Sequence, residues 1–189
     1  MELKHLSDRD LVVRLIGTKA TEKHYRGSLA SLFHDPHLGP LPPKRLFVAK
    51  ELVTRLLAED LRREIITLSS PRNVHLYLLA SYIGQEHESF RVLFLNAQNR
   101  LIASEELFRG TLTQTSVYPR EIVKQALRHN ASAVILAHNH PSGVAEPSRA
   151  DELITQSLKQ ALALVDVKVL DHFVVAGSAV VSLAERGVV

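Results

Sequence analysis

The sequence predicts a mixed α/β domain that follows a small helical region. A chain of 189 residues with 46% hydrophobic content can bury one sizeable core and still carry a small appendage. From about residue 88 onward, short aliphatic runs typical of strands alternate with segments whose apolar residues recur at helical spacing. We therefore expect a helical region over residues 1–65 and an α/β domain over residues 66–189.

Two helices are expected in the N-terminal region. Ser7 and Asp10 have the spacing of a capping box, which predicts a short helix ending before Gly17. Residues 18–43 are poorly patterned, and the stretch 34–43 holds four prolines and a glycine, which indicates a loop at a joint between subdomains. A second helix should follow this loop. Its apolar positions are Leu46, Ala49, Val53, Leu56 and Leu57, and Glu51 and Arg55 form a supporting pair on its outer side.

The α/β domain should begin with a helix and two strands. Ser70 before Pro71 is typical of a helix start, and Gly84 is the expected stop. The segments FRVLFLNA and RLIASEELF then predict two strands around a polar turn at residues 97–100.

The second half of the domain continues the alternation. A helix should open at Pro119, a continuous aliphatic run (SAVILAH) predicts a buried strand, and another helix should start at Ser148. Two short strands near 166–170 and 172–176 are expected to complete the sheet. The inward residues of the first of these helices should be Ile122, Val123, Ala126 and Leu127, and those of the second Ile154, Leu158, Ala161 and Leu162.

Composition narrows the chemistry. The chain has no cysteine, which excludes disulfides, thiolate zinc sites and cysteine nucleophiles, so a transition metal would need His and carboxylate ligands. Its apolar runs are too short to span a bilayer, and the start MELKHLSDRD lacks the apolar stretch of a secretory signal. We therefore expect a cytoplasmic protein that makes no membrane contact.

The net charge of +3 is unevenly distributed. Residues 1–70 carry 12 Lys/Arg against 9 Asp/Glu, whereas residues 71–189 carry 11 of each. This small N-terminal excess is compatible with contact to a nucleic-acid backbone but falls short of the dense basic stripe that would indicate it. We favour an ordinary solvated helical surface as the explanation of this excess.

The segment HNHPSGVAEPSRAD, residues 138–151, carries the strongest chemical signal. It begins where the buried strand ends and closes on the first turn of the next helix. Extended backbone sends the side chains of His138 and His140 to the same side, and Asp151 can add a carboxylate oxygen if the loop folds back. Three protein ligands leave a fourth tetrahedral position open, as in catalytic zinc sites.

Each part of this segment also has a purely structural explanation. An H-x-H pair is unremarkable in a chain with ten histidines. Asp151 stands three residues after Ser148, so S-x-x-D could serve only as the capping box of the helix. The combination of both histidines with Pro141, Ser148 and Asp151 at fixed offsets favours the metal site.

The pattern H-x-H-P-x7-S-x2-D resembles the JAMM metalloprotease motif of MPN domains. The flanking segments ELFRGT, VYPREIV, LAHNHPSG and PSRAD resemble the bacterial RadC family, over roughly residues 86–189. The resemblance implies an MPN/JAMM-like mixed β-sheet domain flanked by helices and similar to cytidine deaminases. It also implies Zn²⁺ held by the residues matching His138, His140 and Asp151, with a helix-capping serine matching Ser148. The Ser148 hydroxyl could also donate a hydrogen bond to an oxyanion, which makes Ser148 a candidate catalytic residue.

The resemblance further implies a glutamate acting as general base near the start of the first core strand, which here matches Glu88. Glu86, Glu105 and Glu106 are the alternatives. The pair Asp171–His172 also matches the RadC family, so His172 lies either near the site or in an ordinary half-buried strand.

The N-terminal region resembles a degenerate helix-hairpin-helix of RadC-like proteins. Such hairpins use paired glycines to let backbone amides approach a DNA phosphate. In HLGPLPPK only Gly39 is present, and His37 occupies the place of the first glycine. DNA binding through this segment is therefore not supported by its residues.

Three hypotheses follow. The first is a zinc-dependent hydrolase, of metallopeptidase or isopeptidase type, acting on a peptide or another amide. The second is a DNA-associated repair accessory protein with a structural or vestigial zinc. The third is a scaffold similar to metal-free MPN domains, which the retained ligands count against. The sequence leaves the oligomeric state open.

Overall fold

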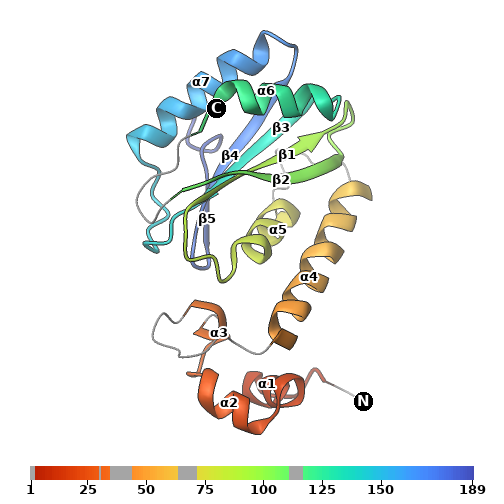
Figure 1. Ribbon diagram of the computed structural model, residues 1–189, viewed down its shortest axis with the longest axis vertical. Coiled ribbons are helices and arrows are strands. Elements are labelled where there is room, and N and C mark those ends of the chain that lie inside the picture. The colour runs from red at the N-terminus through yellow and green to blue at the C-terminus, as the bar shows by residue number, and fades with distance from the viewer. Residues whose placement is uncertain (1–2, 30, 35–43, 64–71, 111–116) are drawn as a thin grey trace. The chain divides into compact units, whose positions relative to one another are not determined.

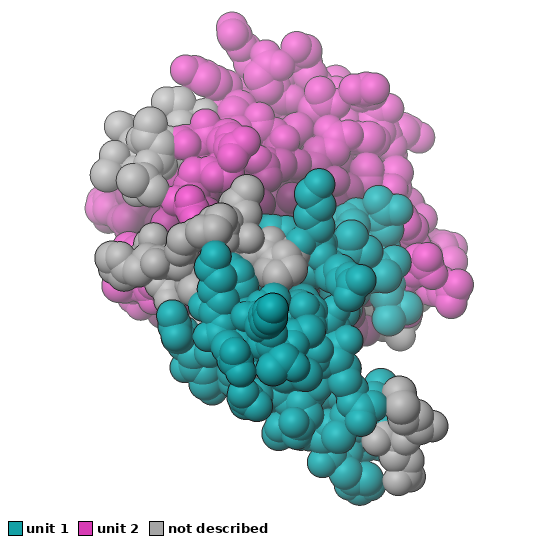
Figure 2. Space-filling model, turned by 60° about the horizontal axis from the view of Figure 1, so that its bottom comes forward, with its two compact units in different colours: residues 1–56 teal, residues 57–189 magenta. Residues whose placement is uncertain are grey.

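Figure 1 shows the computed structural model, which describes residues 3–29, 31–34, 44–63, 72–110 and 117–189. The chain divides into two compact units, Met1–Leu56 and Leu57–Val189 (Figure 2). The expected helix start at Ser70 and Pro71, residues 35–43 of the expected loop, and the boundary between residues 65 and 66 lie outside the described residues. Within the described part of the chain, no helix is both long and apolar enough to cross a bilayer.

The described residues of the first unit form three short helices and the start of a fourth. Helix α1 (Asp8–Ile16) begins as predicted, because Ser7 Oγ accepts a hydrogen bond from the N–H of Asp10. Gly17, at φ 86°, ends α1 and directly precedes α2 (Thr18–His24). Helix α3 spans Ser31–His34. The sequence did not predict α2, since its buried residues are the polar Thr21 and His24 and it shows no apolar periodicity.

Helix α4 (Lys44–Arg63) confirms the long helix expected after the loop. The predicted pair is present, with Arg55 Nε 2.7 Å from Glu51 Oε1. Of the expected apolar positions, Leu46 is buried, in a small cluster with Val12 and Leu32, whereas Val53 and Leu56 are exposed.

The second unit is built on a five-stranded sheet in the order β2-β1-β3-β4-β5. Strands β3 and β4 are parallel and every other neighbouring pair is antiparallel, so the predicted mixed α/β class is confirmed. The specific likeness to cytidine deaminases stays a prediction. The strands are β1 (Ser89–Leu95), β2 (Leu101–Arg109), β3 (Ala133–Asn139), β4 (Lys168–Ala176) and β5 (Ala179–Ser182).

Helices cover both faces of this sheet. Helix α5 (Arg72–Tyr82) lies on one face, and α6 (Pro119–Arg128) and α7 (Arg149–Ala163) lie on the other (Figure 1). Alternation along the strands supplies both cores, because successive side chains point to opposite faces. The α5 side includes Val74, Leu78, Leu93, Ile135 and Phe173, and the α6/α7 side includes Phe90, Val92, Ile122, Leu136 and Leu158.

The prediction that Leu127 faces inward on α6 was wrong. Ile122 and Ala126 are fully buried, but Leu127 is 58% exposed. Leu127 lies about 100° further round the helix than Ala126, which carries its side chain off the narrow buried stripe.

The two short strands expected near 166–170 and 172–176 were also wrong, because β4 is one continuous strand. Its pairing with β3 shifts by one residue at Leu170, a β-bulge that precedes Asp171. The buried carboxylate of Asp171 does not interrupt the strand, since it accepts hydrogen bonds from Ser182 Oγ at 2.7 Å and from the N–H of His172 at 2.6 Å. A turn at Gly177 then leads to β5.

Candidate metal centre

Both histidines of the predicted site stand at the end of the central strand. Strand β3 is buried along its whole length between β1 and β4, so its end is where its polar side chains gather. His138 is 2% exposed and its ring stacks on Phe90, with centroids 6.2 Å apart. The N–H of His140 donates to the carbonyl of Val175 on β4, which continues the extended backbone. The two imidazoles therefore lie together, as their i, i+2 spacing predicts, with centroids 4.8 Å apart.

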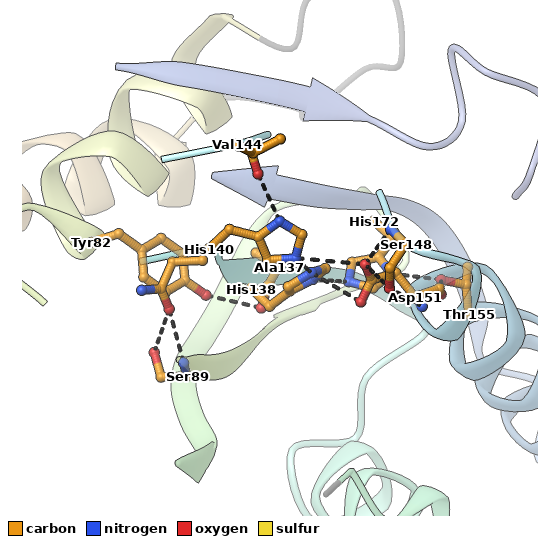
Figure 3. A network of polar contacts seen from close by, with 11 residues as sticks. Tyr82, Ser89, Ala137, His138, His140, Val144, Ser148, Asp151, Thr155 and His172 are labelled. Carbon is orange, nitrogen blue, oxygen red and sulfur yellow. Dashed lines mark hydrogen bonds and ion pairs between the residues drawn. The ribbon is translucent and has the colours of Figure 1, made fainter. Parts of the chain in front are cut away.

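Asp151 enters the site from the first turn of α7. The N–H of Asp151 donates to Ser148 Oγ at 3.2 Å, and the N–H of Ser148 donates to Asp151 Oδ2 at 2.7 Å, so the capping box is complete. The second carboxylate oxygen, Oδ1, lies 3.1 Å from His138 Nε2. The cap and the contact with the histidines therefore coexist in one side chain (Figure 3).

The spacing of these donor atoms fits one metal ion. His138 Nε2 lies 3.0 Å from His140 Nε2, and His140 Nε2 lies 3.6 Å from Asp151 Oδ2. Ligand atoms at the corners of a tetrahedron around zinc, 2.0–2.1 Å from the ion, would be about 3.3 Å apart. Two imidazole nitrogens and a carboxylate oxygen also form a donor set that zinc accepts. The residues present therefore fit a zinc ion with a further coordination position.

The charges in this cluster are strongly coupled. Burial works to raise the pKa of Asp151, but its polar contacts with the His138 and His140 rings outweigh burial and hold that pKa far below its usual range. The hydrogen bond with Asp151 raises the pKa of His140, although burial opposes it, and the charge of Glu88 adds to the increase. Asp151 is therefore ionised at neutral pH, whereas His140 must lose its proton before it can bind a metal.

Glu88 immediately precedes β1, the strand that pairs with β3. The pairing of Phe90 with His138 is antiparallel, and continuing it by two residues brings Glu88 level with His140. Gly110 fixes the backbone there by donating its N–H to the Glu88 carbonyl at 2.8 Å. The effect of the Glu88 charge on the pKa of His140 agrees with this placement.

Asn139, between the two histidines, has a role in this arrangement that the sequence did not reveal. Its side chain is buried and reaches across to β1. Asn139 Oδ1 accepts from the N–H of Ser89 at 2.8 Å, and Nδ2 donates to the carbonyl of His87 at 3.0 Å. These are the backbone groups on either side of Glu88, so one carboxamide holds the segment that carries it.

The three alternative glutamates have other surroundings. Glu86 is exposed in the turn before β1. Glu105 Oε1 lies 2.7 Å from His129 Nε2, and Glu106 Oε2 lies 3.7 Å from Arg91 Nη2. The charge of Glu88, by contrast, contributes to the raised pKa of His140.

His172 is fully buried rather than half-buried, and it contacts the site. Its Nε2 lies 2.8 Å from His138 Nδ1, and its Nδ1 lies 2.6 Å from Thr155 Oγ1 on α7 (Figure 3). Burial holds the pKa of His172 well below its ordinary value, so the ring is neutral. The D-H pattern pointed to His172, but nothing in the sequence indicated Thr155.

Comparison with known proteins agrees with the motif. A family model described as a RadC-like JAB domain matches residues 68–188. The UPF0758 protein of Nitrosomonas eutropha is 52% identical over an alignment that covers 97% of this chain and 90% of that protein. The UPF0758 protein of Nitrosomonas europaea is 59% identical over 82% of this chain and 68% of its own length. That of Nitrosospira multiformis is 51% identical over 96% of this chain and 79% of its own length. The chain therefore belongs to the RadC family of JAB-domain proteins.

Proposed function

We propose that this protein is a zinc-dependent hydrolase of amide bonds, of metallopeptidase or isopeptidase type. The observation that carries the proposal is the convergence of His138 Nε2, His140 Nε2 and an Asp151 carboxylate oxygen within 4.8 Å of one another. The position of Glu88 beside this cluster supports it, and so does membership of a JAB-domain family.

His138, His140 and Asp151 would hold the zinc ion. When bound, zinc would polarise the substrate carbonyl and lower the pKa of the attacking water toward neutrality. The burial of His138 and the capping bonds of Asp151 fix these side chains before any metal arrives. Little conformational entropy then remains to be lost on binding.

Glu88 would act as the general base and then as the general acid. It takes one proton from the water whose oxygen attacks the carbonyl carbon, and it delivers that proton to the nitrogen as the C–N bond breaks. The products are a carboxylic acid and an amine. The Asn139 carboxamide would hold the Glu88 backbone in place during both transfers.

Ser148 would stabilise the oxygen of the substrate carbonyl as negative charge develops on it. Its hydroxyl hydrogen points to Asp151 Oδ2 across 2.7 Å. A hydroxyl turns freely about its C–O bond, so the same hydrogen could be redirected to a substrate oxygen. Removing such a donor from other enzymes costs about 2.7–4 kcal/mol of transition-state stabilisation.

The metal assignment can be tested by measuring zinc in protein purified without added metal. The native chain should retain close to one zinc per molecule, whereas His138→Ala and Asp151→Ala should lose it. His75→Ala provides a matched control, since His75 packs against Phe173 on the α5 side of the sheet. Near-stoichiometric zinc in both site variants would reject the assignment.

Hydrolysis can be tested without knowing the natural substrate. A mixture of peptides from a digested bacterial proteome, with amino termini blocked beforehand, reports each cleavage as a new free amine. Zinc-loaded native protein should generate new amines, and Glu88→Gln should lower the rate by about 10²–10⁴-fold, the usual contribution of a general acid–base. Glu86→Gln is the control, because Glu86 is exposed two residues away. Equal rates for native protein and Glu88→Gln would exclude Glu88 as the base.

A further inference from the structure

A buried series of hydrogen bonds links His138 to Asp151, two of the proposed zinc ligands. It runs from His138 Nδ1 to His172 Nε2 at 2.8 Å, and from His172 Nδ1 to Thr155 Oγ1 at 2.6 Å. Thr155 Oγ1 then lies 2.5 Å from the backbone carbonyl of Asp151. Both His172 and Thr155 are 0% exposed, so solvent cannot replace any of these partners (Figure 3).

The Asp151 carbonyl determines which group donates in each hydrogen bond of this series. The Asp151 carbonyl can only accept, so the contact assigns the single hydroxyl hydrogen of Thr155 to it. Thr155 Oγ1 must then accept from His172, which places the hydrogen of the His172 ring on Nδ1. His172 is fully buried and packs against Phe90, which disfavours a charged ring, so its Nε2 accepts from His138 Nδ1.

We propose that His172 and Thr155 are positioning residues that hold His138 in the tautomer with its hydrogen on Nδ1, leaving Nε2 bare for a metal. This inference rests on the proposed function in that Nε2 is the atom assigned to zinc. The other histidine reaches the same tautomer more simply, because His140 Nδ1 lies 2.8 Å from the carbonyl of Val144. In the reverse direction, the hydrogen of His138 would lie on Nε2 and compete with the ion.

A valine in place of Thr155 keeps the shape of the side chain but removes the acceptor for His172 Nδ1. The His172 hydrogen would then move to Nε2 and donate to His138 Nδ1, which forces the His138 hydrogen onto the atom that should bind zinc. Losing such an outer partner of a ligand typically weakens metal binding about 10- to 100-fold. Thr155→Ser keeps the hydroxyl and should restore affinity close to the native value.

The experiment measures the zinc dissociation constant by competition with a chromophoric chelator. Thr155→Val should bind more weakly by the factor above, while Thr155→Ser and Thr21→Val should bind like the native chain. Thr21 is a matched control, because it is 1% exposed and also donates its hydroxyl to the carbonyl four residues earlier, that of Gly17. Zinc binding by Thr155→Val as tight as by Thr21→Val would overturn the inference.

A second measurement uses the native protein, so it does not depend on whether a variant folds. Long-range ¹H–¹⁵N correlation spectra of the metal-free native protein distinguish the two neutral tautomers of each histidine. His138 and His172 should both carry their hydrogen on Nδ1, and an Nε2 hydrogen on His138 would overturn the inference. A native chain that binds no zinc would instead reject the proposed function, whatever these spectra show.

Discussion

The N-termini of α1 and α7 carry the same S-x-x-D pattern in two different surroundings. At α1, Ser7 Oγ accepts from the N–H of Asp10 at 3.1 Å, and both residues are exposed. At α7, Asp151 N–H donates to Ser148 Oγ in the same way and Ser148 N–H completes the capping box, but the Asp151 carboxylate also contacts two imidazoles. The local motif starts a helix in both places. What distinguishes Asp151 is the strand end that faces it.

The largest expected effect separates the two aspartates. Asp151→Asn should weaken zinc binding more than about 100-fold, since loss of an outer partner alone reaches that size and here a ligand is lost. Asp10→Asn should leave zinc binding unchanged, because Asp10 serves only the start of α1. Metal analysis of both proteins after dialysis measures the difference. Equal zinc content in the two variants would mean that both aspartates are caps and nothing more.

A comparison of variants at Asn139 and Asn96 tests how the backbone around Glu88 is held in place. Asn139→Ala frees the backbone on both sides of Glu88 and should lower peptide turnover by about 10- to 100-fold, the scale expected for a misplaced catalytic group. Zinc content should not change. Asn96→Ala is the control, because Asn96 also accepts backbone N–H groups, from Gln98 and Arg100, but in the turn between β1 and β2.

The same variant can be tested for action through Glu88. In a Glu88→Gln background, Asn139→Ala should have no further effect on turnover, because the group that it positions is already disabled. A reduction of equal size in both backgrounds would show that Asn139 acts in some other way.

The pH dependence follows from the contact between His140 and Asp151. The raised pKa of His140 means that the pair stabilises the metal-free protein below the unfolded value of about 6.5 and loses this contribution as pH rises through the folded pKa. The lowered pKa of Asp151 makes the contribution disappear as pH falls below about 3.9. The pair therefore stabilises the metal-free fold most between these two limits.

Zinc must displace the proton from His140, so zinc affinity should have the opposite trend at mildly acidic pH. We expect the affinity to fall about tenfold for each pH unit below the pKa of His140 in the folded protein, the dependence expected for release of one proton. Titrations from about pH 5.5 to 8 measure it. Affinity that stays constant over this range would show that His140 is not a ligand.

The smallest expected effect is that of the two caps themselves. Ser7→Ala and Ser148→Ala should each cost about 1 kcal/mol of folding free energy through loss of the N-cap. Ser148→Ala should also weaken zinc binding, because Asp151 Oδ2 loses the hydroxyl that it accepts from at 2.7 Å. Denaturant unfolding and chelator competition measure the two effects. Zinc binding weakened equally by both variants would remove the distinction between the caps.

The sequence predicted the fold wherever apolar periodicity was strong. The strands β1 and β3 and the helices α5 and α7 follow from continuous or periodic apolar residues. The prediction failed where polar residues are buried, as Thr21 and His24 are in α2 and Asp171 is in β4. Polar residues enter a core only with tertiary hydrogen-bond partners, and these partners cannot be read from a local pattern.

The metal-site residues could be predicted because they are close together in the sequence. The residues that support them could not, because their positions depend on tertiary contacts. His138, His140, Ser148 and Asp151 lie within one short segment, so their spacing is visible in the sequence. The face on which His172 lies depends on the bulge at Leu170, which only the pairing of β4 with β3 reveals. Asn139 lies between the two histidines in the sequence, and its side chain reaches the backbone that carries Glu88, a contact that no local pattern indicates.

The most direct test of the central claim is anomalous diffraction at the zinc edge from crystals of the zinc-loaded protein. One anomalous peak should lie within bonding distance, about 2.0–2.2 Å, of His138 Nε2, His140 Nε2 and a carboxylate oxygen of Asp151. Its remaining coordination position should face Glu88. A peak bonded to other residues, or a zinc whose coordination is closed by a fourth protein ligand, would contradict the account.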